Sequence, residues 1–217
     1  MATDLEITRL MNNARVRLTG ATDDAMQREL FMVMDEFFKE TNVWKEDIPI
    51  TIPGLDAPGT TYIIAPNEPA NITQLMWVYT PGQSSLRGSP VPASMEVIGE
   101  LVLRNQPALD QTIVVTVALT VQDPVNRDGY VVFPTWIAQR YGDAILDGLL
   151  GRMMTQPNKP WTNNQMSVYH LRRFNGKKAQ TRVEVTRNNV YRAQAWSFPG
   201  FAGGSQKGRS SGWAPPQ

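Results

Sequence analysis

The chain has 217 residues, 41% hydrophobic and 19% charged, which is enough for a sizeable apolar core in one large or two small domains. Its formal net charge of +1 excludes the overall basic excess that marks many nucleic-acid-binding domains. Cysteine is absent, which excludes disulfides and cysteine-ligated metal sites and fits assembly in a reducing cytoplasm. The sequence shows neither a secretory signal nor an apolar run of the about 18 residues that a membrane helix needs.

The N-terminal region predicts two helices. A short one opens the chain and breaks at Gly20. A stronger helix follows, which Thr22 can cap and which we expect to end near Asn42. Its apolar residues recur at helical spacing: Met26, Leu30, Val33, Met34 and Phe37.

The region from Ile48 to Phe133 predicts strands. Proline and glycine interrupt short runs that are rich in β-branched and aromatic residues. The strand candidates are Ile48–Ile52, Thr61–Ala65, Thr73–Tyr79, Met95–Leu103 and Thr112–Val121. Because no helical pattern separates them, we expect an antiparallel sandwich or small barrel.

A helical pattern returns after Pro134. Its apolar stripe comprises Trp136 or Ile137, Tyr141, Ile145, Leu149 and Met153. Gly142, Gly148 and Gly151 lie within the pattern, and each costs up to about 1 kcal/mol of helix propensity. Glycines kept in such positions favour close packing against another helix.

Pro157 and Pro160 end that helix, and a last one is predicted from Thr162 to about Asn188. Thr162 and Gln165 have the spacing of a capping box. The apolar residues assigned to this helix are Met166, Tyr169, Phe174 and Val183.

These elements predict an α+β fold. We expect residues 1–45 and 134–192 to form a helical bundle and residues 46–133 an inserted antiparallel β domain. Residues 193–217 are rich in glycine and serine and cannot build a core, yet they contain large aromatic side chains. We interpret this segment as an extended arm that docks on another protein through Trp196, Phe198, Phe201 and Trp213.

The sequence offers no constellation typical of catalysis. His170 is the single histidine and has no local nucleophile or carboxylate partner, so we interpret it as a surface or packing residue. The doublets Asp35–Glu36 and Glu46–Asp47 are not acid/base pairs by themselves, because adjacent side chains point in different directions. The loop 123–129 lacks the ligand spacing of an EF-hand. We therefore expect no enzyme activity, no cofactor and no metal site.

Basic residues cluster between Arg172 and Arg192, where Glu184 is the one acidic residue. This stretch could face DNA phosphates, complement an acidic neighbouring protein, or form an ordinary solvated surface. Five side chains are the candidates for contact with a neighbouring subunit or a lumen: Arg172, Arg173, Lys177, Lys178 and Arg182.

Short strings distributed over residues 14–200 carry a family resemblance. They are Glu29–Phe31, Glu36–Phe38, Asn42–Glu46, Asp123–Gly129, Trp136–Met154, Gln156–Asn163, Tyr169–Phe174 and Ala195–Pro199. The pattern resembles a family of tailed-phage structural proteins identified as head–tail connector or tail adaptor proteins.

The resemblance implies a helical bundle with an inserted β domain and a closed ring, commonly dodecameric, beneath the portal. It implies that the C-terminal arm reaches the portal, and the segment from Trp196 occupies the corresponding place. The expected partners are the portal protein, tail nozzle or tail tube proteins, and passing double-stranded DNA without specific binding. No membrane is expected. The implied location is the head–tail junction of the virion, after assembly in the host cytoplasm.

A ring needs a heterologous interface, and a lumen that gripped DNA phosphates would stall the genome. We therefore expect the basic stretch to face protein more than DNA, and charge reversals at Arg173 and Lys177 to impair ring assembly. Other possible functions are a tail-completion or tube ring, a peptidoglycan hydrolase and a DNA-binding accessory protein.

Overall fold

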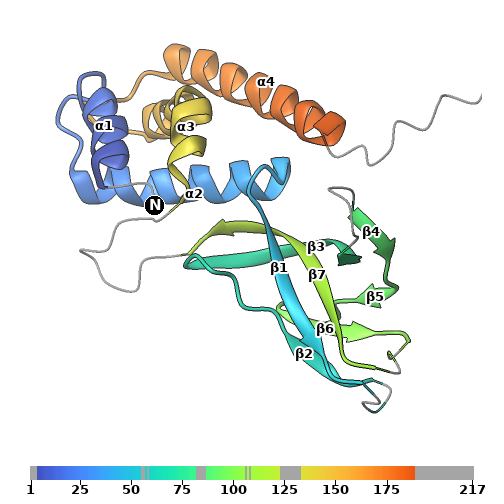
Figure 1. Ribbon diagram of the computed structural model, residues 1–217. Coiled ribbons are helices and arrows are strands. Elements are labelled where there is room, and N and C mark those ends of the chain that lie inside the picture. The colour runs from blue at the N-terminus through green and yellow to red at the C-terminus, as the bar shows by residue number, and fades with distance from the viewer. Residues whose placement is uncertain are drawn as a thin grey trace, which may run out of the picture.

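The computed structural model describes residues 4–54, 57, 59–81, 87–105, 107, 109–122 and 133–188, and its fold is α+β, as predicted. The helices are α1 (Asp4–Arg15), α2 (Asp23–Thr41), α3 (Thr135–Thr155) and α4 (Asn164–Asn188). The strands are β1 (Lys45–Ile52), β2 (Thr61–Ile63), β3 (Ala70–Pro81), β4 (Arg87–Pro90), β5 (Ala93–Ser94), β6 (Glu100–Leu103) and β7 (Gln111–Val121). Helices from both ends of the chain gather on one side, and the strands from the middle lie on the other (Figure 1).

Helix α2 begins and ends where the sequence predicts. The Thr22 hydroxyl accepts a hydrogen bond from the Ala25 amide at 3.4 Å, and Asp23 and Asp24 in the first turn suit the helix dipole. Asn42 ends the helix in the left-handed conformation with φ of 50°, and its amide donates to the Phe38 carbonyl. This helix lies between the sheets and the other helices (Figure 1), so residues from several sides of it are buried.

The strands form two antiparallel sheets. One sheet has the order β1-β7-β3-β4, and the other has the order β2-β6-β5. Strand β7 pairs with β1 on one side and β3 on the other, and Val115–Val121 are buried without interruption. This nearly continuous burial explains why β7 reads as an unbroken run of β formers rather than as an alternating strand.

One predicted strand is wrong in its extent. Residues 95–103 do not form a single strand, because the chain turns back between β5 and β6, which pair with each other. Gly99 has φ of 85°, a left-handed conformation, and the Glu100 amide donates to the Val97 carbonyl at 3.0 Å to close the turn.

Helices α3 and α4 pack closely, as the glycines of α3 predict. A Cβ atom added at Gly148 would lie 2.5 Å from Val33 Cγ1 of α2 and 3.0 Å from the Phe174 ring of α4. A Cβ atom added at Gly151 would lie 2.8 Å from the Leu171 side chain. Because glycine has no side chain, Gly148 and Gly151 allow three helices to approach one another closely.

The predicted N-terminus of the last helix is shifted by two residues. Asn163 caps α4, since its Oδ1 accepts from the Met166 amide at 3.1 Å. The Thr162 hydroxyl instead donates to the Gln156 carbonyl and accepts from the Lys159 amide, so it holds the α3–α4 connection.

The helices and sheets share one apolar cluster. Phe38 of α2 contacts Trp44 just before β1, with ring centroids 5.7 Å apart, and it also contacts Phe133. The Thr120 hydroxyl of β7 donates to Asp35 of α2 at 2.9 Å. This continuity means that the sheet supports the helical layer directly.

Candidate functional site

Helix α4 carries the basic residues singled out in the sequence, and its orientation decides which of them can meet another molecule. The buried face of α4 is largely polar: Ser167, His170, Phe174, Lys178 and Thr181 are all buried. Met166, Tyr169 and Val183 are instead 40%, 50% and 51% exposed. Of the four apolar residues that the sequence assigns to this helix, Phe174 alone lies in the core.

The buried histidine contacts a buried carboxylate. His170 Nδ1 lies 3.0 Å from Asp147 Oδ1, and both side chains are almost completely buried between α3 and α4. His170 Nε2 is also buried and has no hydrogen-bond partner. The nearby Ser167 hydroxyl donates to the Gly151 carbonyl at 2.8 Å. His170 is thus a packing residue in the interior, and its partner Asp147 lies too far away in sequence to have been recognised.

Two of the predicted contact residues, Arg173 and Lys177, form ion pairs with the buried carboxylate of Asp147. Arg173 Nε lies 3.3 Å and Lys177 Nζ 3.2 Å from Asp147 Oδ2. A glutamate at either position would therefore stand beside Asp147. Reversal of these charges would disturb folding as well as assembly, so the expected effect of such variants on ring assembly does not isolate a subunit contact.

A third predicted contact residue, Lys178, is used within its own chain. Its Nζ lies 2.5 Å from Glu36 Oε1 and 3.0 Å from Glu40 Oε1, both on α2. Arg152 of α3 also contacts Glu36, at 2.7 Å. Lys178 therefore belongs to an interhelical ion-pair network that joins α2, α3 and α4, and its contact with a subunit or a lumen stays a prediction.

The network shifts the pKa values of Glu36 and Lys178. Burial by itself would raise the pKa of the Glu36 carboxyl, but hydrogen bonds and charge from Lys178 and Arg152 outweigh burial and lower it. Burial would lower the pKa of the Lys178 ammonium, but Glu36 and Glu40 outweigh burial and raise it. Glu36 and Lys178 therefore stay charged over a wider pH range than the free side chains do.

The remaining candidates, Arg172 and Arg182, are exposed. Within the part of the chain that the structure describes, no carboxylate lies within ion-pair distance of either guanidinium. The acidic residue of this stretch, Glu184, forms an ion pair with Arg140 of α3. The predicted arm residues Trp196, Phe198, Phe201 and Trp213 lie outside the described residues.

The two carboxylate doublets have structural partners. Asp35 binds Lys39 and Thr120, whereas Glu36 turns to Arg152 and Lys178. In the second doublet, Glu46 accepts from the Asn67 amide at 3.0 Å, and Asp47 accepts from Thr116 and Tyr79. Neighbouring carboxylates thus diverge, as expected, and neither doublet forms a convergent acid/base pair.

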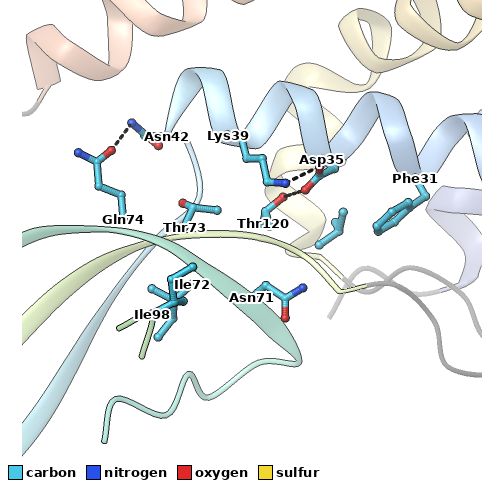
Figure 2. A pocket seen from close by; sticks show the side chains of 11 residues that line it. Phe31, Asp35, Lys39, Asn42, Asn71, Ile72, Thr73, Gln74, Ile98 and Thr120 are labelled. Carbon is cyan, nitrogen blue, oxygen red and sulfur yellow. Dashed lines mark hydrogen bonds and ion pairs between the residues drawn. The ribbon is translucent and has the colours of Figure 1, made fainter. Parts of the chain in front are cut away.

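A groove of about 720 Å³ lies where α2 crosses β3 and β7 (Figure 2). Its lining includes the Asp35–Lys39 ion pair and the hydrogen bond between Asn42 and Gln74, at 3.3 Å, together with the apolar side chains of Phe31, Ile72 and Ile98. Among the described residues no three His, Cys, Asp or Glu side chains gather as a metal site would require. The charged groups of the groove, Asp35 and Lys39, are paired with each other, and Asp35 also accepts from Thr120.

An exposed apolar patch lies at the turn between β5 and β6. The sequence pattern predicts strand at this turn and therefore does not predict the patch. Ile63 of β2 and Val97 and Ile98 of the β5–β6 turn are 79%, 56% and 70% exposed. Glu96 and Glu100 are exposed beside them, and Ile63 and Glu100 are paired across β2 and β6. The one sequence signal for this patch is Gly99, because a glycine within a strand pattern can mark a turn.

Comparison with models of known protein families finds no match to this chain, and a search of curated proteins also finds none. In the described residues no helix has the length and apolar character needed to cross a membrane.

Proposed function

We propose that this chain is a structural protein of a tailed-phage virion, namely the subunit of a head-to-tail adaptor ring. The ring would dock on the portal, give the genome a passage and provide the platform to which the tail attaches. One observation carries the proposal: the strings that resemble the adaptor family occur in a chain whose two ends build a helical layer with an antiparallel β unit inserted between them. This is the architecture that the resemblance implies.

The state of the polar side chains supports a structural role. His170 is buried against Asp147. The carboxylates of the doublets Asp35–Glu36 and Glu46–Asp47 bind side chains and backbone groups of other elements. These groups maintain the fold and do not converge on a shared open site.

The distribution of charge supports the passage of DNA without tight binding. Several basic residues of α4 are neutralised by carboxylates of the same chain, which reduces the number of phosphate contacts that each subunit could make. Such a subunit fits a channel through which DNA moves better than it fits a DNA-binding accessory protein.

Light scattering of the purified protein tests the proposal. The mass should be measured alone and after mixing with the portal ring of the same virus, both for the full chain and for a chain that ends at Gln194. We expect many copies of the full chain to bind one portal ring, and the shortened chain to bind poorly because it lacks Trp196, Phe198, Phe201 and Trp213.

A full chain that remains monomeric and ignores the portal would overturn the adaptor function. Self-assembly into rings without portal binding would favour a tail-completion or tube ring instead. Equal portal binding by both chains would show that the arm is not the docking element.

A further inference from the structure

The outer stripe of α4, on the side away from α3, combines apolar and basic side chains. It consists of Met166, Tyr169, Arg172, Gly176, Val183 and Arg187. These residues follow one another at steps of three, four or seven, so they share one face of the helix. Among the described residues, no carboxylate pairs with Arg172 or Arg187.

Tyr169 is held in place although it is half exposed. Its hydroxyl accepts from Arg173 at 3.2 Å, its ring lies 5.5 Å from the Arg173 guanidinium, and its other neighbour is the His170 ring at 5.2 Å. A rigid, amphipathic tyrosine loses little conformational entropy on binding, which is why such residues dominate interface energies.

Gly176 also belongs to the stripe, and no close contact among the described residues accounts for a glycine at this position. A Cβ atom added there would meet no described residue within 4 Å, in contrast to Gly148 and Gly151. A glycine in the middle of an exposed helix lowers stability without benefit inside the chain. Close approach of a second molecule at this point would explain it.

The patch at the β5–β6 turn has the complementary character. We call it the acidic turn: Ile63, Glu96, Val97, Ile98 and Glu100. It presents large apolar side chains with two carboxylates, and no cation of the described residues pairs with either carboxylate. The outer stripe presents large apolar side chains with two unpaired guanidinium groups, so the two surfaces match in apolar character and are opposite in charge.

We propose that the outer stripe of one copy of this chain docks on the acidic turn of the next copy. This inference rests on the proposed ring and assigns its subunit interface. The two surfaces belong to different parts of the molecule, the stripe to the helical layer and the turn to the smaller sheet on the other side of α2 (Figure 1). Such an interface is heterologous and repeats from copy to copy, as a ring requires, whereas a two-fold dimer would pair identical surfaces.

Charge reversal followed by mixing tests this interface. One variant carries Arg172→Glu and Arg187→Glu, and the other carries Glu96→Lys and Glu100→Lys. Each variant alone brings like charges together, so we expect self-association measured by light scattering to weaken by about ten-fold or more. The equimolar mixture should assemble again, because each reversed surface then meets its opposite on the other variant.

Arg17→Glu is the matched control, since Arg17 is exposed, lies in the α1–α2 connection and belongs to neither surface. We expect it to assemble like the wild type. Circular dichroism of each variant establishes that the helical content is unchanged, and recovery in the mixture independently shows that both variants are folded.

If wild-type chains associate only on the portal ring, the same variants are compared by the number of copies bound per portal ring. Reversed variants that assemble as well as the wild type would overturn the interface while leaving the adaptor function intact. Weakened variants that the mixture does not rescue would show that the two surfaces do not meet each other. Variants that form rings but lose the portal would mean that the stripe meets the portal instead.

Discussion

Glu36 is the carboxylate on which three helices converge. It belongs to α2 and forms ion pairs with Lys178 of α4 and Arg152 of α3. The Glu36 side chain is 28% exposed and that of Lys178 is 11% exposed, so solvent screens this contact less than it screens an ordinary surface pair. Partly buried pairs of this kind are costly to break because one charge then loses its partner.

The lowered pKa of Glu36 predicts a specific pH dependence of stability. Because the folded-state pKa lies below the usual 4.5, the stabilisation from Glu36 is fully present above pH 4.5 and is lost as the pH falls through the lowered value. Lys178 has the opposite sign: its stabilisation is present below the usual 10.5 and is lost as the pH rises through the raised pKa. Between these limits the contribution of Glu36 and Lys178 to the free energy of unfolding does not change with pH.

We predict that Glu36→Gln lowers the free energy of unfolding by about 1–2 kcal/mol near neutral pH, and that the difference from wild type shrinks below pH 4.5. Urea unfolding over this pH range measures both effects. Glu40→Gln is the control, because its side chain is 52% exposed and should contribute little. A difference that does not change with pH would contradict the assignment.

At the scale of the element, glycines in two adjoining helices have different reasons to be there. Gly148 in α3 makes room for Val33 and the Phe174 ring, whereas none of the residues that the structure describes would lie within 4 Å of a Cβ atom at Gly176 in α4. The same substitution should therefore have opposite effects at the two positions.

Gly148→Ala should lower the free energy of unfolding by about 1–3 kcal/mol, because the added methyl group overpacks the three-helix contact. Gly176→Ala should raise it by about 0.5–1 kcal/mol in the unassembled chain, because alanine favours helix and meets no neighbour. Thermal or urea unfolding at low protein concentration compares the two. Equal losses at both positions would show that Gly176 is needed inside the chain.

At the scale of the whole molecule, α2 joins the two halves. It packs on α3 and α4 on one side and on β7 on the other, and Asp35 bonds to Thr120 across that boundary. The apolar cluster runs through this contact without a break, with Phe37 toward α3 and α4 and Phe38 toward Trp44.

We predict that the helices and sheets unfold together. Helical circular dichroism at 222 nm and tryptophan fluorescence, to which the buried Trp44 contributes, should give the same midpoint in urea, as expected for a single cooperative unit. Two separated transitions would show that the β unit folds independently of the helices.

Local chemistry was enough to predict the four helices and the longer strands, but not β4 or the turn between β5 and β6. The caps of α2, the β-branched run of β7 and the apolar stripe of α3 depend on residues a few positions apart, and the structure confirms them. The close approach at Gly148 and Gly151 was also predictable, since glycine in a helix is costly unless packing requires it. The α+β class follows from this order of elements.

The sequence alone therefore determined the four helices and the longer strands, whereas tertiary structure decided which face of α4 is buried and which charges are paired. Met166, Tyr169 and Val183 resemble a packed stripe, yet α4 buries His170 and Lys178 instead, because Asp147 and Glu36 of other helices supply their partners. Such pairs join residues far apart in the chain, and a local pattern cannot specify them. Burial of a charge is favourable only where a distant partner is brought close, and that is a property of the assembled fold.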